Sequence, residues 1–101
     1  MEENNQVQAT ELVINYTIND SKFSDSFVLD SNDIQEIMNL AIDLIDQFSS
    51  KNIQITTPRT FMTDLSNIET KEKAHDQLIT NIEKIKELES NYTEELSLTL
   101  K

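Results

Sequence analysis

Carboxylates are the most numerous side chains in this sequence that could do chemistry, and they are placed unevenly. Residues 1–50 contain ten Asp and Glu residues and one cation, Lys22, whereas residues 51–101 contain nine carboxylates and seven cations. The whole chain has a formal net charge of −11. Because an acidic surface attracts basic molecules and repels nucleic acid and anionic lipid, we expect the first half of the chain to face a basic partner.

Paired carboxylates can serve acid–base catalysis or hold a divalent cation. The candidate pairs here are Asp30 with Asp33, Asp43 with Asp46, and Glu94 with Glu95. In a chain with 19 acidic residues, such pairs also arise by chance wherever a solvated acidic face occurs. We therefore interpret these pairs as charged surface and expect no metal site.

Other catalytic groups are sparse. His75 is the only histidine, and it lies near Glu72 and Asp76 in a stretch with helical periodicity. A general base oriented by a carboxylate would have to use this residue, but a histidine on the side of a surface helix is the simpler interpretation. The chain contains no cysteine and no glycine, which excludes thiolate chemistry and glycine-rich phosphate loops. We expect no catalytic residue and no cofactor.

Alternating apolar residues predict a β-hairpin in the first third of the chain. Residues 1–10 lack periodicity, so we expect a flexible N-terminal arm there and a single domain over residues 11–101. Residues 19–22 form a turn cluster, because Asn and Asp tolerate left-handed backbone. Asp25 is the one polar residue on the inward face of the second strand. The inward residues are Leu12, Ile14, Tyr16 and Ile18 on the first strand, and Phe23, Phe27 and Leu29 on the second.

A period of 3.6 residues predicts two helices. The first follows an N-cap at Asp30 or Ser31 and runs to about Ser50. The second begins with a capping box over residues 66–69 and ends near Ser90. The residues expected to face the core are Ile34, Ile37, Met38, Ala41, Ile45 and Phe48 on the first helix, and Leu78, Ile82 and Ile85 on the second.

Two further strands complete the predicted fold. Ile53 and Ile55 alternate with polar residues over 52–57, in a strand that Pro58 ends or restricts to a sheet edge. Neither period fits residues 58–66. Leu96, Leu98 and Leu100 alternate to the chain end and predict a last strand. The order ββαβαβ predicts an α+β fold, a two-layer sandwich with two helices on one face of a small mixed sheet.

These features favour a small acidic, non-enzymatic binding protein. Size, charge and abundant residues with AT-rich codons (12 Ile and 10 Asn) resemble those of inhibitors encoded by phages or mobile elements of low-GC bacteria. Such an inhibitor would be a decoy that presents carboxylates to a basic nucleic-acid-binding protein, for example a host defence nuclease or a replication factor. The residues expected to form this surface are Asp20, Asp30, Asp33, Glu36, Asp43 and Asp46.

Two alternative functions remain open. One is a homo-oligomeric assembly protein that dimerises through the C-terminal helix or through an uncovered last strand containing Leu96, Leu98 and Leu100. The other is an immunity protein or antitoxin that neutralises a basic nuclease. The charge makes direct binding to nucleic acid unfavourable, and no apolar run reaches the length of a membrane span. We expect a cytoplasmic protein of a bacterial host cell.

Overall fold

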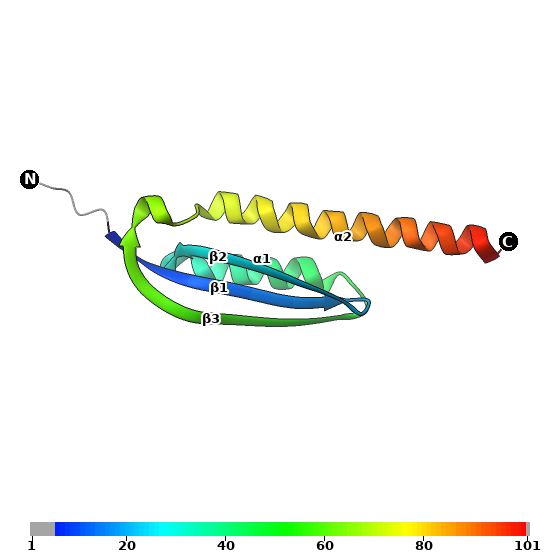
Figure 1. The fold of residues 1–101 in the computed structure, drawn as a ribbon, viewed down its shortest axis with the longest axis horizontal. Helices are drawn as coiled ribbons and strands as arrows, with labels where there is room; N and C mark the ends of the chain where they lie inside the picture. The colour runs from blue at the N-terminus through cyan, green and yellow to red at the C-terminus, as the bar shows by residue number, and fades with distance from the viewer. Residues whose placement is uncertain (1–5, 101) are drawn as a thin grey trace, which may run out of the picture.

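The structure is a computed structural model that describes the backbone of residues 6–100 and the side chains of residues 6–88 (Figure 1). The elements follow in the order β1 (Gln6–Ile18), β2 (Ser21–Asp30), α1 (Ile34–Asp46), β3 (Lys51–Asp64) and α2 (Lys71–Leu100). Short 3-10 helices at Ser31–Asp33 and Leu65–Asn67 precede α1 and α2. The predicted α+β fold, with two helices on a small sheet, is confirmed.

β1 and β2 form the predicted hairpin, in which Ile18 lies opposite Ser21. The two residues between them, Asn19 and Asp20, have φ angles of 50° and 71°. Two successive left-handed residues are typical of a type I′ turn, which matches the twist of the flanking strands. β1 begins at Gln6, so residues 6–10 belong to the sheet instead of the predicted arm. Residues 1–5 lie outside the described part of the chain.

β3 completes a three-stranded antiparallel sheet in the order β2-β1-β3. The sheet is not mixed, because the fourth strand that the sequence predicted is absent from it. β3 is longer than expected, since pairing with β1 resumes after Pro58 and continues to Asp64. The register shifts between Glu11 and Val13 of β1, so Pro58 lies in a bulge of an edge strand. An edge bulge tolerates proline because proline has no N–H to donate.

α1 has the core face and the N-terminal cap that the sequence predicts. The backbone N–H of Asn32 donates to Asp30 Oδ1 at 2.9 Å, which caps the short 3-10 helix that leads into α1. The α1 residues that are buried are Ile34, Ile37, Ala41 and Ile45, followed by Phe48 just beyond the helix.

α2 corrects two predictions. It begins at Lys71, and its cap is Thr70, whose Oγ1 accepts the N–H of Lys73 at 3.2 Å, instead of the predicted capping box at Ser66. The backbone stays helical to Leu100, so the predicted strand of Leu96, Leu98 and Leu100 is wrong. Leucine and glutamate have high helix propensity, and no Gly or Pro lies between residues 71 and 100 to end the helix.

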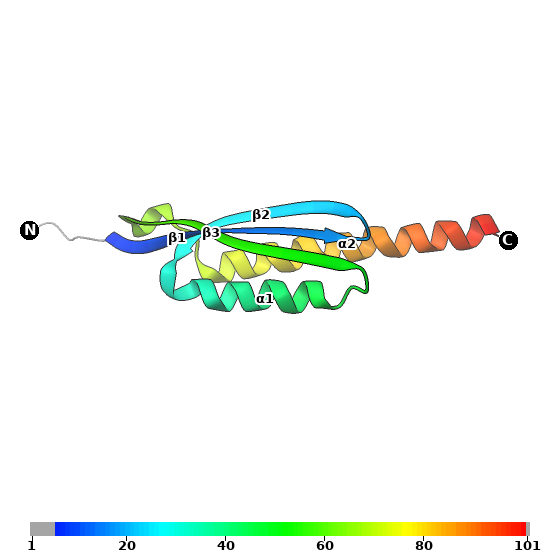
Figure 2. The ribbon, with the colours of Figure 1, turned by 90° about the horizontal axis from the view of Figure 1, so that it is seen from below.

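Both helices cover one face of the sheet, and no element of residues 6–100 covers the other face (Figure 2). The core lies between these two layers. Beyond the β1–β2 turn, α2 continues past the end of the sheet in both views. Among the described side chains of α2, Ile85 is the last buried one. The strand and α2 residues of the core are Leu12, Ile14, Tyr16, Ile18, Phe27, Leu29, Ala74, Leu78, Ile82 and Ile85.

Candidate partner-binding surface

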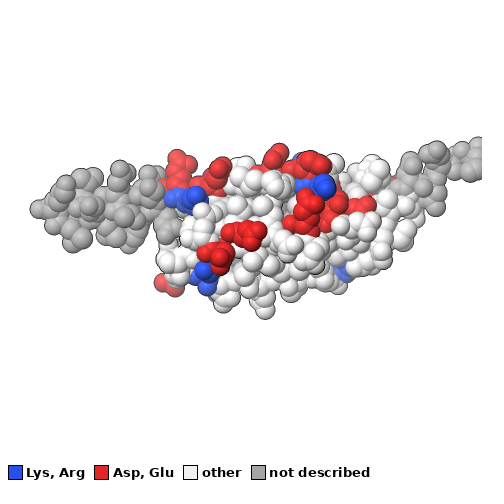
Figure 3. All heavy atoms as spheres, turned by 180° about the vertical axis from the view of Figure 1, so that it is seen from behind, with Lys and Arg blue, Asp and Glu red and all other residues white. Residues whose placement is uncertain are grey.

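The six carboxylates predicted to face a partner are spread along the molecule. Asp20 lies in the β1–β2 turn, whereas Asp30 and Asp33 lie at the other end of β2, where α1 begins. Figure 3 shows the carboxylates of the face seen from behind in several groups, separated by neutral surface and by Lys or Arg side chains. The exposed side of α1 carries the remaining three, Glu36, Asp43 and Asp46.

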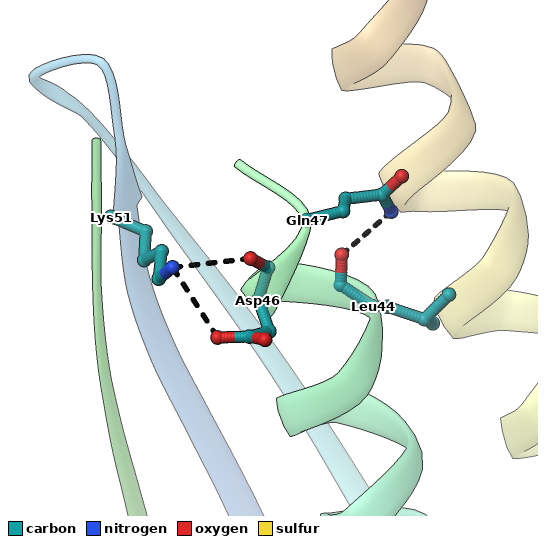
Figure 4. A network of polar contacts seen from close by, with 4 residues as sticks. All are labelled: Leu44, Asp46, Gln47 and Lys51. Atoms are coloured by element: carbon teal, nitrogen blue, oxygen red, sulfur yellow. Dashed lines mark hydrogen bonds and ion pairs between the residues drawn. The ribbon is translucent and has the colours of Figure 1, made fainter. Parts of the chain in front are cut away.

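Three of these six carboxylates already have partners within the chain. Asp30 caps the helical turn, and Glu36 Oε1 lies 3.4 Å from Lys71 Nζ, a contact that joins α1 to α2. The hydrogen bond from Lys71 to Glu36 and the negative charge of Glu36 raise the pKa of Lys71. Asp46 Oδ1 lies 3.3 Å from Lys51 Nζ, which also donates to the backbone carbonyl of Asp46 at 3.1 Å (Figure 4). Exposed ion pairs stabilise a fold little, so Glu36 and Asp46 can exchange their lysines for other partners.

Asp25 lies partly buried on the side of β2 that faces the core. Its Oδ2 accepts the hydroxyl of Tyr16 at 2.7 Å, and its Oδ1 accepts Nδ2 of Asn81 from α2 at 2.9 Å. Burial raises the pKa of Tyr16 above its ordinary value, and the hydrogen bond to Asp25 adds to the effect. The Tyr16 ring also stacks on Phe23, with 5.5 Å between ring centroids. Asp25 therefore ties the hairpin to α2, and both of its carboxylate oxygens accept hydrogen bonds from within the chain.

A hollow of about 300 Å³ lies where the two helices begin, and we call it the acidic hollow. The loop before α2 reaches this place because the N–H of Glu69 donates to the carbonyl of Val28 at 2.8 Å, beside β2. The lining residues are Asp30, Asp33, Leu65, Ile68, Glu69, Thr70, Lys71 and Glu72.

The chemistry of the acidic hollow suits a basic side chain. Four carboxylates line it against one ammonium, Lys71, which is itself paired with Glu36. Leu65 and Ile68 supply an apolar wall beside those carboxylates. Arginine and lysine combine a charged end with an apolar stem, and a guanidinium binds carboxylates through two parallel hydrogen bonds. The hollow thus matches an arginine or lysine in both parts.

Sequence patterns could find only part of this hollow. Of the six predicted carboxylates it brings together two, Asp30 and Asp33. Glu69 and Glu72 come from a segment more than 30 positions later, and no periodic pattern links the two segments. The contact depends on the pairing of that segment with β2.

A second hollow, of about 620 Å³, lies on the uncovered face of the sheet near the β1–β2 turn. Most of the described residues that line it are polar, and none of them is a carboxylate, so it is separate from the acidic surface. Lys22 is its only charged residue. The side chains that the strand register places on this face are Asn15, Thr17, Lys22, Ser24, Asn52 and Gln54.

The remaining chemical candidate, His75, lies partly exposed on α2. In residues 6–88, no group of three or more His, Asp or Glu side chains is placed to hold a metal ion. No helix in the described part of the chain has both the length and the apolar character of a membrane span. No protein-family model, curated protein or solved structure matches the chain.

Proposed function

We propose that this chain is a small acidic protein, without enzymatic activity, that binds a basic surface of another protein. The observation that supports this most is the acidic hollow, in which Asp33 and Glu72 line the same cavity as Leu65 and Ile68. An arginine of the partner would donate to the carboxylates while its stem contacts the apolar wall.

The charge of the whole chain supports the same proposal. A net charge of −11 attracts a basic partner over a distance and raises the rate of encounter. Asp43 on the exposed side of α1 adds to this field, and the exposed pairs Glu36–Lys71 and Asp46–Lys51 can rearrange when a partner binds.

The class of partner that we propose is a nucleic-acid-binding protein, because such proteins carry the most basic surfaces. A host defence nuclease or a replication factor would be blocked if the chain occupied its phosphate-binding groove. The inhibitor would then be encoded by a phage or mobile element and act in the cytoplasm of a bacterial cell. An immunity protein or antitoxin for a basic nuclease is a second candidate that rests on the same charge.

The test is affinity capture from a bacterial lysate, followed by titration of the purified captured protein. One triple variant neutralises the hollow: Asp33→Asn, Glu69→Gln and Glu72→Gln. A matched control, Asp76→Asn, Glu83→Gln and Glu87→Gln, removes three exposed charges from α2 outside the hollow. Both variants change the net charge equally, so a difference between them reports on the place of the charges.

We expect the control to bind nearly as well as the original chain. The hollow variant should bind at least ~10-fold more weakly, because loss of one charged hydrogen bond costs about 1.5 kcal/mol or more. Capture of no basic protein, or equal affinity of the two triple variants, would contradict the proposal.

A further inference from the structure

The two edges of the sheet are covered to different degrees. Beside β2, the N–H of Glu69 donates to the carbonyl of Val28, and Asn81 of α2 donates to Asp25. Both contacts place later segments of the chain against this strand. β3 forms the other edge, and no strand of the described chain pairs with its outer side. An unpaired edge is a template for another strand.

The hairpin register shows which backbone groups β3 directs outward. In a two-residue hairpin the residues that flank the turn, here Ile18 and Ser21, form a hydrogen-bonded pair. Bonding alternates along an antiparallel strand, so the odd-numbered residues of β1 bond β3, through their partners Asn52, Gln54 and Thr56. The residues left to direct N–H and C=O groups away from the sheet are Lys51, Ile53, Ile55 and Thr57.

This stretch of edge lacks the features that usually prevent pairing. Charged side chains, lysine above all, commonly protect an edge strand, but residues 52–57 contain no charged residue in a chain of net charge −11. Lys51 folds back onto the last turn of α1, where its Nζ contacts Asp46 (Figure 4). Pro58 interrupts the strand only at the far end of this stretch.

An apolar strip lies beside the same edge. Ile53 and Ile55 of β3 are only partly buried, and so is Met38 of α1. Ile42 lies one helical turn before Asp46, on the same side of α1. Because Asp46 contacts Lys51 of β3, Ile42 also projects toward this edge. Its side chain is exposed, with 44% of the residue accessible to solvent. Leu44 points the other way, toward α2 (Figure 4).

We propose that a second copy of the chain covers this strip, with β3 paired antiparallel to its counterpart about a two-fold axis at Gln54. This register places Ile53 of one protomer opposite Ile55 of the other and joins their outward N–H and C=O groups. It also places Lys51 opposite Thr57, which avoids contact between like charges. The product is a six-stranded sheet. The proposal concerns a different surface from the acidic hollow and does not depend on the proposed function.

The helices fit the same axis. The contact between Lys51 and Asp46 aligns β3 with the end of α1. From Lys51 to Gln54 the strand advances roughly 10 Å, which equals about seven residues of helix. The axis therefore passes α1 near Asn39, between Met38 and Ile42. In the dimer, Met38 of one protomer contacts Ile42 of the other. The contact between the two α1 helices thus forms beside the contact between the two β3 strands.

A single cysteine tests this register directly, because the chain has none of its own. On the axis, Gln54 faces its own counterpart as a non-hydrogen-bonded pair with Cα atoms about 4.5 Å apart, within the range of a disulfide. We expect Gln54→Cys to form a covalent dimer on mild oxidation, seen on a non-reducing gel. Asn52→Cys is the matched control on the same face, where the two thiols would be roughly 13 Å apart along the strands. Equal cross-linking of the two variants would overturn the register.

Sedimentation equilibrium tests the association without a cross-link. We expect the original chain to give twice its 11.7 kDa mass, and a monomer at the highest soluble concentration would overturn the proposal. Ile42→Lys should raise the dissociation constant at least ~10-fold, because it places a charge in the apolar strip. Met62→Lys, on the part of β3 beyond Pro58 with 59% of Met62 exposed, should leave it unchanged. Equal effects of the two substitutions would also overturn the proposal.

Discussion

One carboxylate, Asp25, has a structural role in the fold. It accepts one hydrogen bond from Tyr16 and one from Asn81, which joins both strands of the hairpin to α2. A carboxylate in a partly buried place is tolerated because donors replace the water that it loses. Two exposed acids of α1, Glu36 and Asp46, also contact lysines of other elements, but such exposed ion pairs stabilise a fold little.

Tyr16 makes this network testable through pH. Burial and the bond to Asp25 raise the pKa of Tyr16 in the folded chain, whereas tyrosine in the unfolded chain ionises near pH ~10. A raised folded pKa stabilises the fold below that pH, and the stabilisation is lost as the pH rises above it. We expect the free energy of unfolding, measured with urea, to fall more steeply above pH ~10 in the original chain than in Tyr16→Phe. Equal slopes would show that Tyr16 is not the group responsible.

Thr70 and Ser66 give a second test at the scale of the residue. Thr70 Oγ1 accepts the N–H of Lys73, and loss of such a cap costs about 1 kcal/mol. Thermal denaturation should therefore show a lower melting temperature for Thr70→Ala and little change for Ser66→Ala. The reverse order would mean that the capping box predicted from the sequence forms after all.

Among the elements, the β1–β2 hairpin depends on a turn that its sequence fits imperfectly. Asp20 has a φ of 71°, a left-handed conformation that costs a residue with a Cβ roughly 1 kcal/mol. Glycine at this position has no such cost. We expect Asp20→Gly to raise the free energy of unfolding by up to ~1 kcal/mol, measured with urea, and Asp20→Ala to lower it. Because Asp20 lies at the opposite end of β2 from the acidic hollow, affinity for the partner should stay the same; a large loss would place Asp20 in the interface.

The elements that the sequence predicts well are those whose pattern is long and local. The alternation in β1 and the apolar face of α1 both lie within about a dozen residues, and the structure buries the residues expected there except Met38, which is only partly buried. The last strand was wrong because three alternating leucines are a weak signal beside thirty residues of continuous helix. The second half of β3 fits no period, since the bulge at Pro58 shifts the register.

The acidic hollow was only half predictable for a different reason. Asp30 and Asp33 lie in the predicted acidic stretch, but Glu69 and Glu72 join them only through the contact of the preceding loop with β2. This contact is a tertiary one. A single sequence contains no local signal for it.

At the scale of the whole molecule, the acidic hollow and the unpaired edge of β3 lie in different places. The acidic hollow lies where the helices begin, whereas the uncharged edge of β3, residues 52–57, lies along the part of the sheet nearer the β1–β2 turn. A two-fold axis at Gln54 would therefore place two acidic hollows toward opposite ends of a dimer. Such a dimer could bind a basic partner at two points, which raises affinity when both points fit one target.

Titration of the captured partner at low and high salt tests the central claim most directly. If the acidic hollow binds a basic side chain, the original chain will lose affinity steeply as salt is added. The triple variant Asp33→Asn, Glu69→Gln and Glu72→Gln will bind at least ~10-fold more weakly at low salt and depend less on salt. Equal affinity and an equal salt dependence for the two proteins would contradict the account.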